Sequence, residues 1–466
     1  MKDRVHKSHG HNHIPISQLC IAITGIDPLN TNTLKRFAFF FIRPTRTQKM
    51  NGMTSGYQSI RFFFHPHIAG VGSIEQHSDG HGKSFKNPLI CRKETIFYPL
   101  SLPVKITLVA GARPNFMKIA PIIRAIHSSN KAGDKMISFR LVHTGQHYDE
   151  KLSHVFFKEL ELPEPDVNLG AGSGTQAEQT ARIMIEFEKD LSLNPTDLVV
   201  VVGDVTSTLA CTIVAKKMNT KVAHVEGGIR SFDMTMPEEI NRMVTDALAD
   251  YFFTTTAIAN ENLMKVGIGA ERIFFVGNTM IDSLQFSLDK LKRPEVLNSL
   301  TGIEKGYWVL TLHRPSNVDD SNKLNSLLRL IDGEANDRPI IFPVHPRTMK
   351  TLSAFANEFK NIKPIAPLSY FEFIYLIRAA QCVITDSGGI QEETTVLGIP
   401  CLTLRNNTER PETVSFGTNE LIGDDESKLK LALEKVVACK WKKGTIPDKW
   451  DGYSASRIIK AILEFY

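Results

Sequence analysis

From residue 104 onward, short apolar runs alternate with longer segments in which apolar residues recur every three or four positions. An unbroken apolar run bounded by turn residues is typical of a strand buried in a parallel sheet, and the amphipathic segments predict helices that cover both faces of the sheet. Two of these predicted helices span 116–129 and 207–218. In the first half, the predicted strands span 104–111, 139–145, 197–204, 221–227, 250–256 and 272–278.

A polar break at 290–305 is followed by a second copy of this pattern. Its predicted strands span 306–313, 338–345, 361–367, 380–386 and 399–404. The sequence therefore predicts an α/β protein with two doubly wound, Rossmann-like domains, 104–288 and 289–453, and a final helix at 454–466 that packs back on the first domain. Ligands of such sheets bind beyond the carboxyl ends of the strands, so we expect the active site in the interdomain cleft.

The first 103 residues follow no such pattern. They hold 13 Lys and Arg against 5 Asp and Glu, and 8 of the 15 histidines. A histidine-rich tract can bind metal, but no packed core follows this one, so we expect a disordered or non-native extension. Because a GUG codon can initiate translation and is read as Val when internal, we hypothesise that translation starts at Val104. Native peptides from residues 1–103 would contradict this hypothesis.

Charge and composition exclude several classes of protein. The formal net charge of +5 comes from the first 103 residues alone, because residues 104–466 carry a net charge of −3 and show no basic footprint for nucleic acid. No apolar run reaches the ~18 residues that a membrane span needs. The six cysteines are scattered without a CxxC pair, which favours buried thiols in a reducing compartment over zinc ligands or disulfides.

One stretch, ITDSGGIQEETTVLG, joins a predicted strand to a helix through Ser387, Gly388 and Gly389. Two glycines allow a tight turn and a close approach to a ligand. A helix that begins there points free amides and a positive dipole end at that ligand, which suits phosphate. Glutamates a few residues later can hold hydroxyl groups such as those of a ribose. The stretch therefore predicts a site for a nucleoside diphosphate.

The first domain has polar residues at the ends of three predicted strands. GARPNFMK offers Arg113 and Lys118 for phosphate oxygens, although an ordinary strand-to-helix turn explains it equally well. Asp204 in GDVTSTL and Glu226 in HVEGG sit at strand tips, and Glu238 follows Pro237 at a helix start, where an acidic residue is also common for dipole reasons. Carboxylates converging on one cleft favour acid–base chemistry.

The second domain adds residues around its predicted strand ends. His313 and Arg314 in TLHRPSN favour phosphate contact, whereas His345 in PVHPR fits a structural role equally well. In PLSYFEF, aromatic rings can flank a base, although helix packing is the favoured interpretation for Tyr370. Arg410 in NNTERPE can close on the nucleotide.

Together these motifs resemble those of the non-hydrolysing UDP-N-acetylglucosamine 2-epimerases, in the family's order and over residues 104–466. The resemblance implies a GT-B-like fold, a cytoplasmic homodimer, a UDP-sugar substrate for surface polysaccharide, and no metal or redox cofactor. It also implies elimination of UDP across C1–C2 to give 2-acetamidoglucal, followed by addition of UDP with protonation of the other face.

The resemblance also implies residue roles. The acid–base groups would be Asp204, Glu226 and Glu238, and His313 would stabilise the leaving diphosphate. The other roles fall on residues expected to bind substrate. Diphosphate, ribose and uracil contacts would come from Arg113, Lys118, the amides of Ser387, Gly388 and Gly389, Glu393, Phe373 and Arg410.

The chain departs from the family pattern in three places. Asn115 replaces a common Glu, Leu368 stands where some relatives have Gln, and GAGSGTQAE lacks an Arg found in some regulated members. Four alternatives stay open: an epimerase of a modified UDP-sugar such as a 2,3-diacetamido uronic acid, a hydrolysing epimerase, a GT-B glycosyltransferase, and a UDP-sugar sensor. Product analysis distinguishes the enzymes from one another.

Overall fold

The structure is a computed structural model that describes residues 58–61, 73–76, 103–133, 136–146, 157–344, 346–352, 355 and 358–466. The first of these segments form β1 (Gln58–Arg61) and β2 (Ser73–Gln76), which pair antiparallel. Apart from these two strands and residue 103, the extension expected at 1–103 lies outside the described residues. His345 also lies outside them. Within the described residues no helix is both long and apolar enough to cross a membrane.

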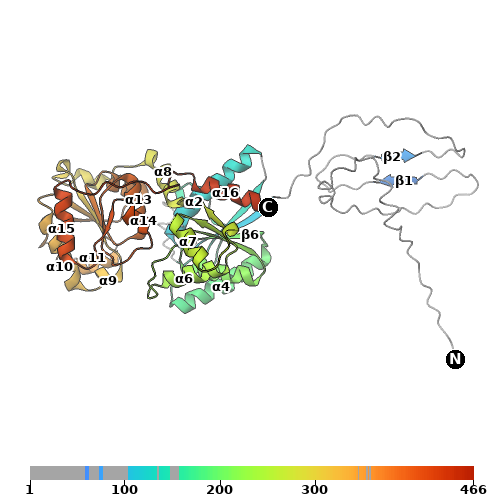
Figure 1. Cartoon of the computed structure of the whole chain (residues 1–466), viewed down its shortest axis with the longest axis horizontal. Helices are drawn as coiled ribbons and strands as arrows, with labels where there is room; N and C mark the ends of the chain where they lie inside the picture. Colours follow the sequence, from blue (N-terminus) through green and yellow to red (C-terminus); the bar gives the residue numbers. More distant parts are fainter. Residues whose placement is uncertain are drawn as a thin grey trace, which may run out of the picture. The chain divides into compact units, whose positions relative to one another are not determined.

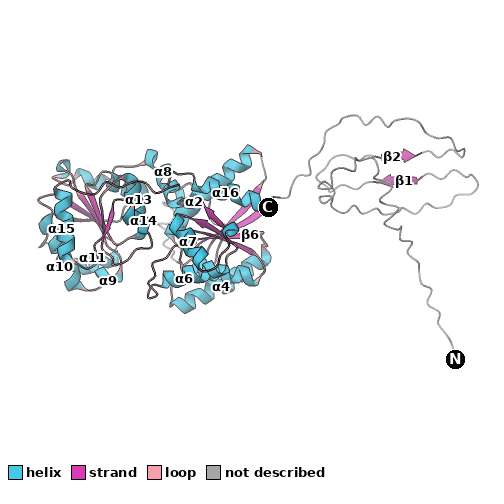
Figure 2. Ribbon diagram, in the orientation of Figure 1, coloured by secondary structure: helices cyan, strands magenta, loops and turns pink. Residues whose placement is uncertain are grey.

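The first domain is built on a seven-stranded parallel sheet with strand order β5-β4-β3-β6-β7-β8-β9. Helices cover both faces, as Figure 2 shows, and each face has its own apolar core. The strands are β3 (Val104–Ala110), β4 (Ile137–His143), β5 (Val167–Asn168), β6 (Leu198–Val202), β7 (Lys221–Val225), β8 (Tyr251–Thr254) and β9 (Ile273–Phe275). The helices are α2 (Arg113–Ala132), α4 (Gln176–Leu193), α5 (Thr206–Lys217), α6 (Pro237–Leu248), α7 (Ala257–Lys265) and α8 (Thr279–Ser287).

The second domain repeats this design with six parallel strands in the order β12-β11-β10-β13-β14-β15. The strands are β10 (Trp308–Thr311), β11 (Ile340–Pro343), β12 (Ile362–Ile365), β13 (Cys382–Thr385), β14 (Cys401–Thr403) and β15 (Asn419–Leu421). The helices are α9 (Pro315–Val318), α10 (Ser321–Glu334), α11 (Pro346–Leu352), α12 (Tyr370–Arg378), α13 (Gly388–Leu397), α14 (Pro411–Ser415) and α15 (Glu426–Val437).

The last helix, α16 (Ser454–Phe465), lies on the first domain although it follows the second in the chain (Figure 1). Its Ile458 and Ile462 are fully buried in the same apolar core as β3 and α2. The Phe465 ring stacks on the Tyr251 ring of β8 with 4.2 Å between centroids. The chain therefore crosses between the domains twice, and its end closes the core of the domain that it left.

The strand order places the functional motifs. In each sheet the first strand lies between the second and the fourth, so the order reverses at β3–β6 and at β10–β13. Loops that leave the carboxyl ends on the two sides of such a reversal diverge and leave room for a ligand. The two doubly wound sheets confirm the predicted fold class, whereas the short outer strands β5 and β15 were not predicted.

Candidate active site

The end of β6 carries the first carboxylate of the site. Asp204 follows Gly203, whose φ of +65° lets the chain turn sharply after the strand. One Asp204 oxygen accepts from Arg242 Nε at 3.0 Å and from Arg242 Nη2 at 2.5 Å, and the Asp204 carbonyl accepts from Asn241 at 2.9 Å. Burial acts to raise the pKa of Asp204, but the charges of Arg242 and Lys118 outweigh it and the pKa is lowered. Asp204 is therefore held as a carboxylate.

The end of β7 carries the second carboxylate, Glu226, which is 3% exposed and has a φ of +72°. A positive φ in a residue with a side chain is strained and typical of functional sites. Its Oε2 accepts from Lys118 Nζ at 2.6 Å and from Arg410 Nη2 at 3.1 Å. Within the described residues its buried Oε1 has no hydrogen-bond partner, and neither does Arg410 Nη1. The pair thus leaves one acceptor and one donor free for a polar ligand.

Arg410 joins the two domains at this point. It follows β14 in the second domain, whereas Glu226 belongs to the first. Its Nε also lies 2.5 Å from Oε1 of Glu392 on α13, and the same oxygen accepts from Asn278 at 2.8 Å. Burial raises the pKa of Glu392, and Arg410 offsets only part of that effect. A second link between the domains runs from Asn407 to Asp233 at 2.9 Å.

The end of β10 presents His313. Its side chain is 58% exposed, and its Nδ1 lies 2.6 Å from Asp386 Oδ1 at the end of the neighbouring strand β13. Asp386 is fully buried and also accepts from the backbone amides of His313 and Arg314 and from Asn317. Burial acts to raise the pKa of Asp386, but the hydrogen bond and charge of His313 lower it. Asp386 therefore fixes the orientation of the imidazole through its Nδ1.

Gly388 and Gly389 begin α13, as the sequence predicts for an anion site, and as its first two residues their amides have no acceptor within the helix. A Cβ at Gly388 would lie 2.6 Å from a carboxylate oxygen of Glu409, so this close approach requires glycine. The amide of Ser387 donates to Thr385 Oγ1 at 3.0 Å and is already used in this state. Of the three amides expected to bind the diphosphate, those of Gly388 and Gly389 are therefore without an acceptor inside the helix, whereas that of Ser387 already has one.

Glu393 lies one turn further along α13 and is 4% exposed. It accepts a hydrogen bond of 3.0 Å from the hydroxyl of Tyr370. Burial raises the pKa of Glu393 to about 8. The Tyr370 amide donates to Glu159 of the first domain at 3.1 Å, so helix packing alone does not describe Tyr370. Phe373 is half-buried on the same helix, α12.

Three further residues from the sequence motifs differ in their surroundings. Glu238 is half-buried at the start of α6, and its charge acts on Arg314 across the domain boundary. Glu239, its neighbour, is 1% exposed and accepts from Ser231, Phe232 and Arg242, which makes it structural. Arg113 is exposed at the start of α2.

Asn115 is also structural. Its Oδ1 accepts from the amides of Gly111 and Ala112, and its Nδ2 donates to the Val202 carbonyl at 3.0 Å. It therefore ties the β3–α2 turn to the end of β6. Arg242 and Asp386 stand within the sequence motifs, but their roles could not be predicted from the sequence. Each acts on a side chain at the end of another strand, Arg242 on Asp204 and Asp386 on His313.

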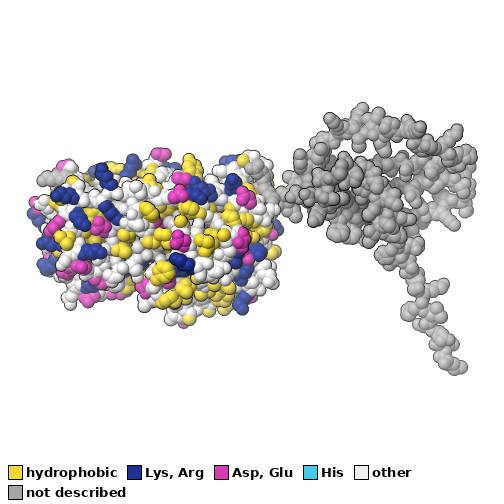
Figure 3. Space-filling view, in the orientation of Figure 1, with side chains coloured by type: hydrophobic (Ala, Val, Ile, Leu, Met, Phe, Trp, Pro, Cys, Tyr) yellow, Lys and Arg dark blue, Asp and Glu magenta, His cyan; other side chains and the backbone are white. Residues whose placement is uncertain are grey.

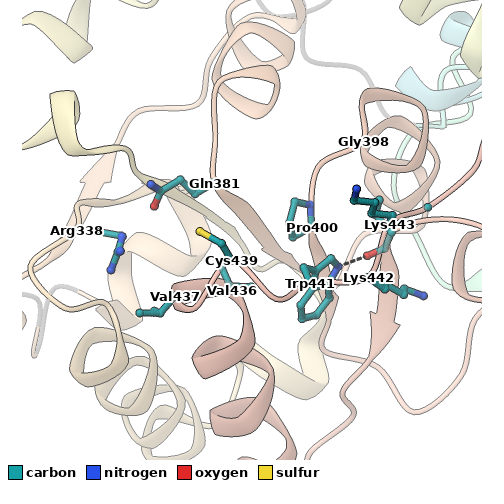
Figure 4. Close-up of a pocket in the computed structure, with 12 residues that line it drawn as sticks. Arg338, Gln381, Gly398, Pro400, Val436, Val437, Cys439, Trp441, Lys442 and Lys443 are labelled. Atoms are coloured by element: carbon teal, nitrogen blue, oxygen red, sulfur yellow. Dashed lines mark hydrogen bonds between the residues drawn. The ribbon is translucent and has the colours of Figure 1, made fainter.

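A cavity of about 530 Å³ lies elsewhere in the second domain (Figure 4). Its lining includes Arg338, Gln381 and Pro400, which lie just before β11, β13 and β14. These positions are at the amino ends of the strands, opposite the end that carries His313 and α13. Its volume would suit a small molecule, but the polar groups described above do not line it.

Comparison with known proteins agrees with this site. A family model described as UDP-N-acetylglucosamine 2-epimerase matches residues 130–463. The UDP-N-acetylglucosamine 2-epimerase of Methanocaldococcus jannaschii is 44% identical over 77% of this chain and 99% of its own length. A crystal structure of the M. jannaschii enzyme in complex with UDP-GlcNAc and UDP matches with a TM-score of 0.69 and 42% identity, over 78% of this chain and all of that chain. A UDP-2,3-diacetamido-2,3-dideoxy-D-glucuronate 2-epimerase of Pseudomonas aeruginosa is 38% identical over 69% of this chain and 88% of its length.

Proposed function

This chain belongs to the UDP-N-acetylglucosamine 2-epimerase family, and from that premise we propose that it interconverts UDP-N-acetylglucosamine and UDP-N-acetylmannosamine without releasing free sugar. The observation that carries the proposal is the Arg410–Glu226 contact of 3.1 Å. It brings the carboxylates of the first domain to the anion-binding helix of the second, and it leaves a buried acceptor and a buried donor free.

The second domain would hold the nucleotide. The amides of Gly388 and Gly389 and the α13 dipole would meet the diphosphate, together with Arg113, Lys118 and His313, which Asp386 orients. UDP is the leaving group in the elimination, so each of these cations and hydrogen-bond donors would lower the barrier by stabilising its negative charge. Glu393 would accept from the ribose hydroxyls and Phe373 would lie beside the uracil.

The first domain would move the proton at C2. Inversion requires that the proton leave from one face of the sugar and that another arrive on the opposite face, so one carboxylate alone would only restore the starting sugar. Asp204, Glu226 and Glu238 are the candidates. Asp204, with its lowered pKa, is ionised, as a group that accepts a proton must be, and the same lowered pKa makes it a weak base. Elimination across C1–C2 gives 2-acetamidoglucal and UDP, and addition of UDP with protonation of the other face gives the epimer.

The direct test is proton NMR of the full chain with UDP-N-acetylglucosamine in deuterated water. We expect UDP-N-acetylmannosamine with deuterium at C2. Free N-acetylmannosamine with UDP would instead identify a hydrolysing enzyme, and turnover of only UDP-2,3-diacetamido-2,3-dideoxy-D-glucuronate would identify a different substrate. Glu226→Gln should lose ~10²–10⁴-fold in kcat. Glu261→Gln, at an exposed glutamate of α7, is the matched control and should keep full activity.

We also propose that the protein is a homodimer that joins through α4 and α6. Figure 3 shows hydrophobic side chains gathered over these two helices. Ile185 of α4 and Ile240 and Met243 of α6 are 52%, 44% and 44% exposed. A second copy of the same surface would bury them by two-fold symmetry. Ile240→Glu with Met243→Glu should convert the dimer to a monomer in light scattering, and a native protein that is already monomeric would refute the proposal.

We further propose, from the family resemblance, that the enzyme acts in the cytoplasm and supplies activated N-acetylmannosamine for surface polysaccharide. Disruption of the gene should remove N-acetylmannosamine-derived sugars from that polysaccharide, and cell fractionation should recover the protein with cytoplasmic markers. Unchanged polysaccharide composition would contradict the first part of the proposal, and recovery outside the cytoplasm would contradict the second.

A further inference from the structure

A buried histidine–aspartate pair lies directly beneath the strand tips that carry Asp204 and Glu226. His224 on β7 is 0% exposed and Asp246 on α6 is 1% exposed. His224 Nδ1 lies 2.7 Å from Asp246 Oδ1, and His224 Nε2 lies 2.8 Å from the carbonyl oxygen of Gly203. Neither residue can reach a substrate from this position, so neither is part of the acid–base set proposed above.

Both ring nitrogens of His224 are used in this pair. Nε2 donates to the Gly203 carbonyl, because a backbone carbonyl has no proton to donate. Burial acts to raise the pKa of Asp246, but the hydrogen bond and charge of His224 and the charge of Arg230 lower it overall. Asp246 therefore holds the ring from the Nδ1 side while Nε2 reaches Gly203.

The groups around the ring hold Asp246 in place. Asp246 Oδ2 accepts from the amide of Gly228 at 3.0 Å and from Arg230 Nη1 at 2.6 Å. Those two donors, Arg230 and Gly228, come from the loop after β7. The register partner of His224 on β8 is Phe252, which is apolar. Lys118 is the further cation near Gly203, with its Nζ 2.8 Å from where a Cβ of Gly203 would lie.

The hydrogen bond from His224 to the Gly203 carbonyl connects this pair to the turn that carries Asp204. The Gly203 amide donates to the Val225 carbonyl at 3.0 Å, while the Gly203 carbonyl accepts from His224. Gly203 is therefore held to β7 through both its amide and its carbonyl, and the carbonyl is part of the Gly203–Asp204 peptide. A Cβ at Gly227 would lie 3.0 Å from the Phe252 ring and 3.3 Å from Asp246 Oδ1, so a larger residue there would press on the pair.

We propose that His224, held by Asp246, is a positioning residue that orients the Gly203–Asp204 turn for proton transfer at C2. The kinetic test rests on the proposed function. A displacement of a catalytic group by about 1 Å can cost ~10²-fold in rate, so a fixed turn matters for catalysis.

The positioning role is tested by two substitutions that each keep one hydrogen bond. The Asn side chain places its amide near Nδ1, so His224→Asn keeps the bond to Asp246 and loses the one to Gly203. The Gln side chain places its amide near Nε2, so His224→Gln does the reverse. We expect His224→Asn to lower kcat ~10–100-fold with KM unchanged, and His224→Gln to lower kcat much less but reduce Tm more, because the buried Asp246 loses its hydrogen-bond partner at Oδ1.

Folded His224→Asn protein with the wild-type kcat would overturn the positioning role, and equal losses of kcat in both variants would do so as well. If His224→Asn does not fold, the kcat of His224→Gln still decides. A Gln variant with a kcat more than ~100-fold down would mean that the Gly203 bond alone does not position the turn. Wild-type enzyme that fails to turn over UDP-N-acetylglucosamine contradicts the proposed function instead.

Discussion

Two helices of twelve residues, α6 and α16, bury opposite kinds of surface. In α16 the apolar side faces inward, with Ile458 and Ile462 fully buried in the first domain. In α6 the inward side is charged: Glu239, Arg242 and Asp246 are 1%, 2% and 1% exposed. Its apolar Ile240 and Met243 face outward instead. An amphipathic pattern therefore identifies a helix, but it does not say which side the protein buries.

The physical difference lies in what each helix packs against. Helix α16 meets apolar side chains of α2 and β8, whereas α6 meets the carboxyl ends of β6 and β7, where polar groups are concentrated. Every buried charge of α6 has a partner of opposite sign: Arg242 bridges Asp204 and Glu239, and Asp246 pairs with His224 and Arg230. Such pairs contribute little net stability, because desolvation opposes their attraction. Their value here is to fix the carboxylates of the site.

The largest effect on the difference between the two helices is expected from Arg242→Met, which removes the central charge on the buried side of α6. It leaves Asp204 and Glu239 without their main cation, so we expect a loss of ~3–5 kcal/mol in the free energy of unfolding. We also expect kcat to fall ~10²–10⁴-fold, because Asp204 loses its fixed orientation. Denaturant titration and the epimerase assay measure the two effects.

Two controls accompany that variant. Arg378→Met replaces an exposed arginine of α12 and should change neither quantity. Arg242→Lys keeps the charge without the two-nitrogen contact to Asp204, and should be less impaired in both quantities. Arg242→Met protein with normal kcat would show that this buried charge is dispensable for the chemistry.

A second prediction concerns the apolar side of α16. Ile458→Ala creates a cavity in the first core, so the free energy of unfolding should fall by ~2–5 kcal/mol. The kcat of the folded fraction should stay unchanged, in contrast to Arg242→Met. Leu431→Ala, at a leucine of α15 that is 59% exposed, is the matched control and should change stability by less than ~0.5 kcal/mol. A large loss of kcat in Ile458→Ala would contradict this separation of stability from chemistry.

The smallest expected effect concerns α13, whose buried Glu393 has a hydroxyl and not a cation as its hydrogen-bond partner. Its pKa is raised from 4.5 to about 8 in the folded state. The folded protein therefore binds more protons than the unfolded chain between these values. This group contributes stability below pH 4.5 that is lost as the pH rises through about 8.

Glu393→Gln should therefore flatten the decline of Tm between about pH 5 and pH 8. Glu412, whose pKa is raised by burial to about 7, will keep part of that slope. Glu434→Gln, at an exposed glutamate of α15, is the control and should leave the slope unchanged. A slope in Glu393→Gln equal to that of the native protein would contradict the raised pKa.

Much of the fold was predictable because the hydrophobic pattern is local. The apolar runs marked eleven of the strands in the two sheets, since each is a short apolar run followed by a turn, and the central strands such as β6 and β13 are buried throughout. The short strands β5 and β15, of two and three residues, carry too few positions to show a pattern. The motifs at strand ends were also local, so Asp204, Glu226, His313 and the glycines of α13 could be chosen as candidates. Their roles in catalysis and binding stay predictions.

The sequence by itself determined the two sheets, the strand ends where polar residues gather, and the family to which these motifs belong. Only the tertiary structure decided which side of α6 is buried and which groups are partners: Glu226 and Arg410 are 184 positions apart in the chain, and His313 and Asp386 belong to different strands. The reason is physical. Periodicity records whether a residue meets water or a core, whereas the partner of a buried charge depends on which strand ends the fold brings together.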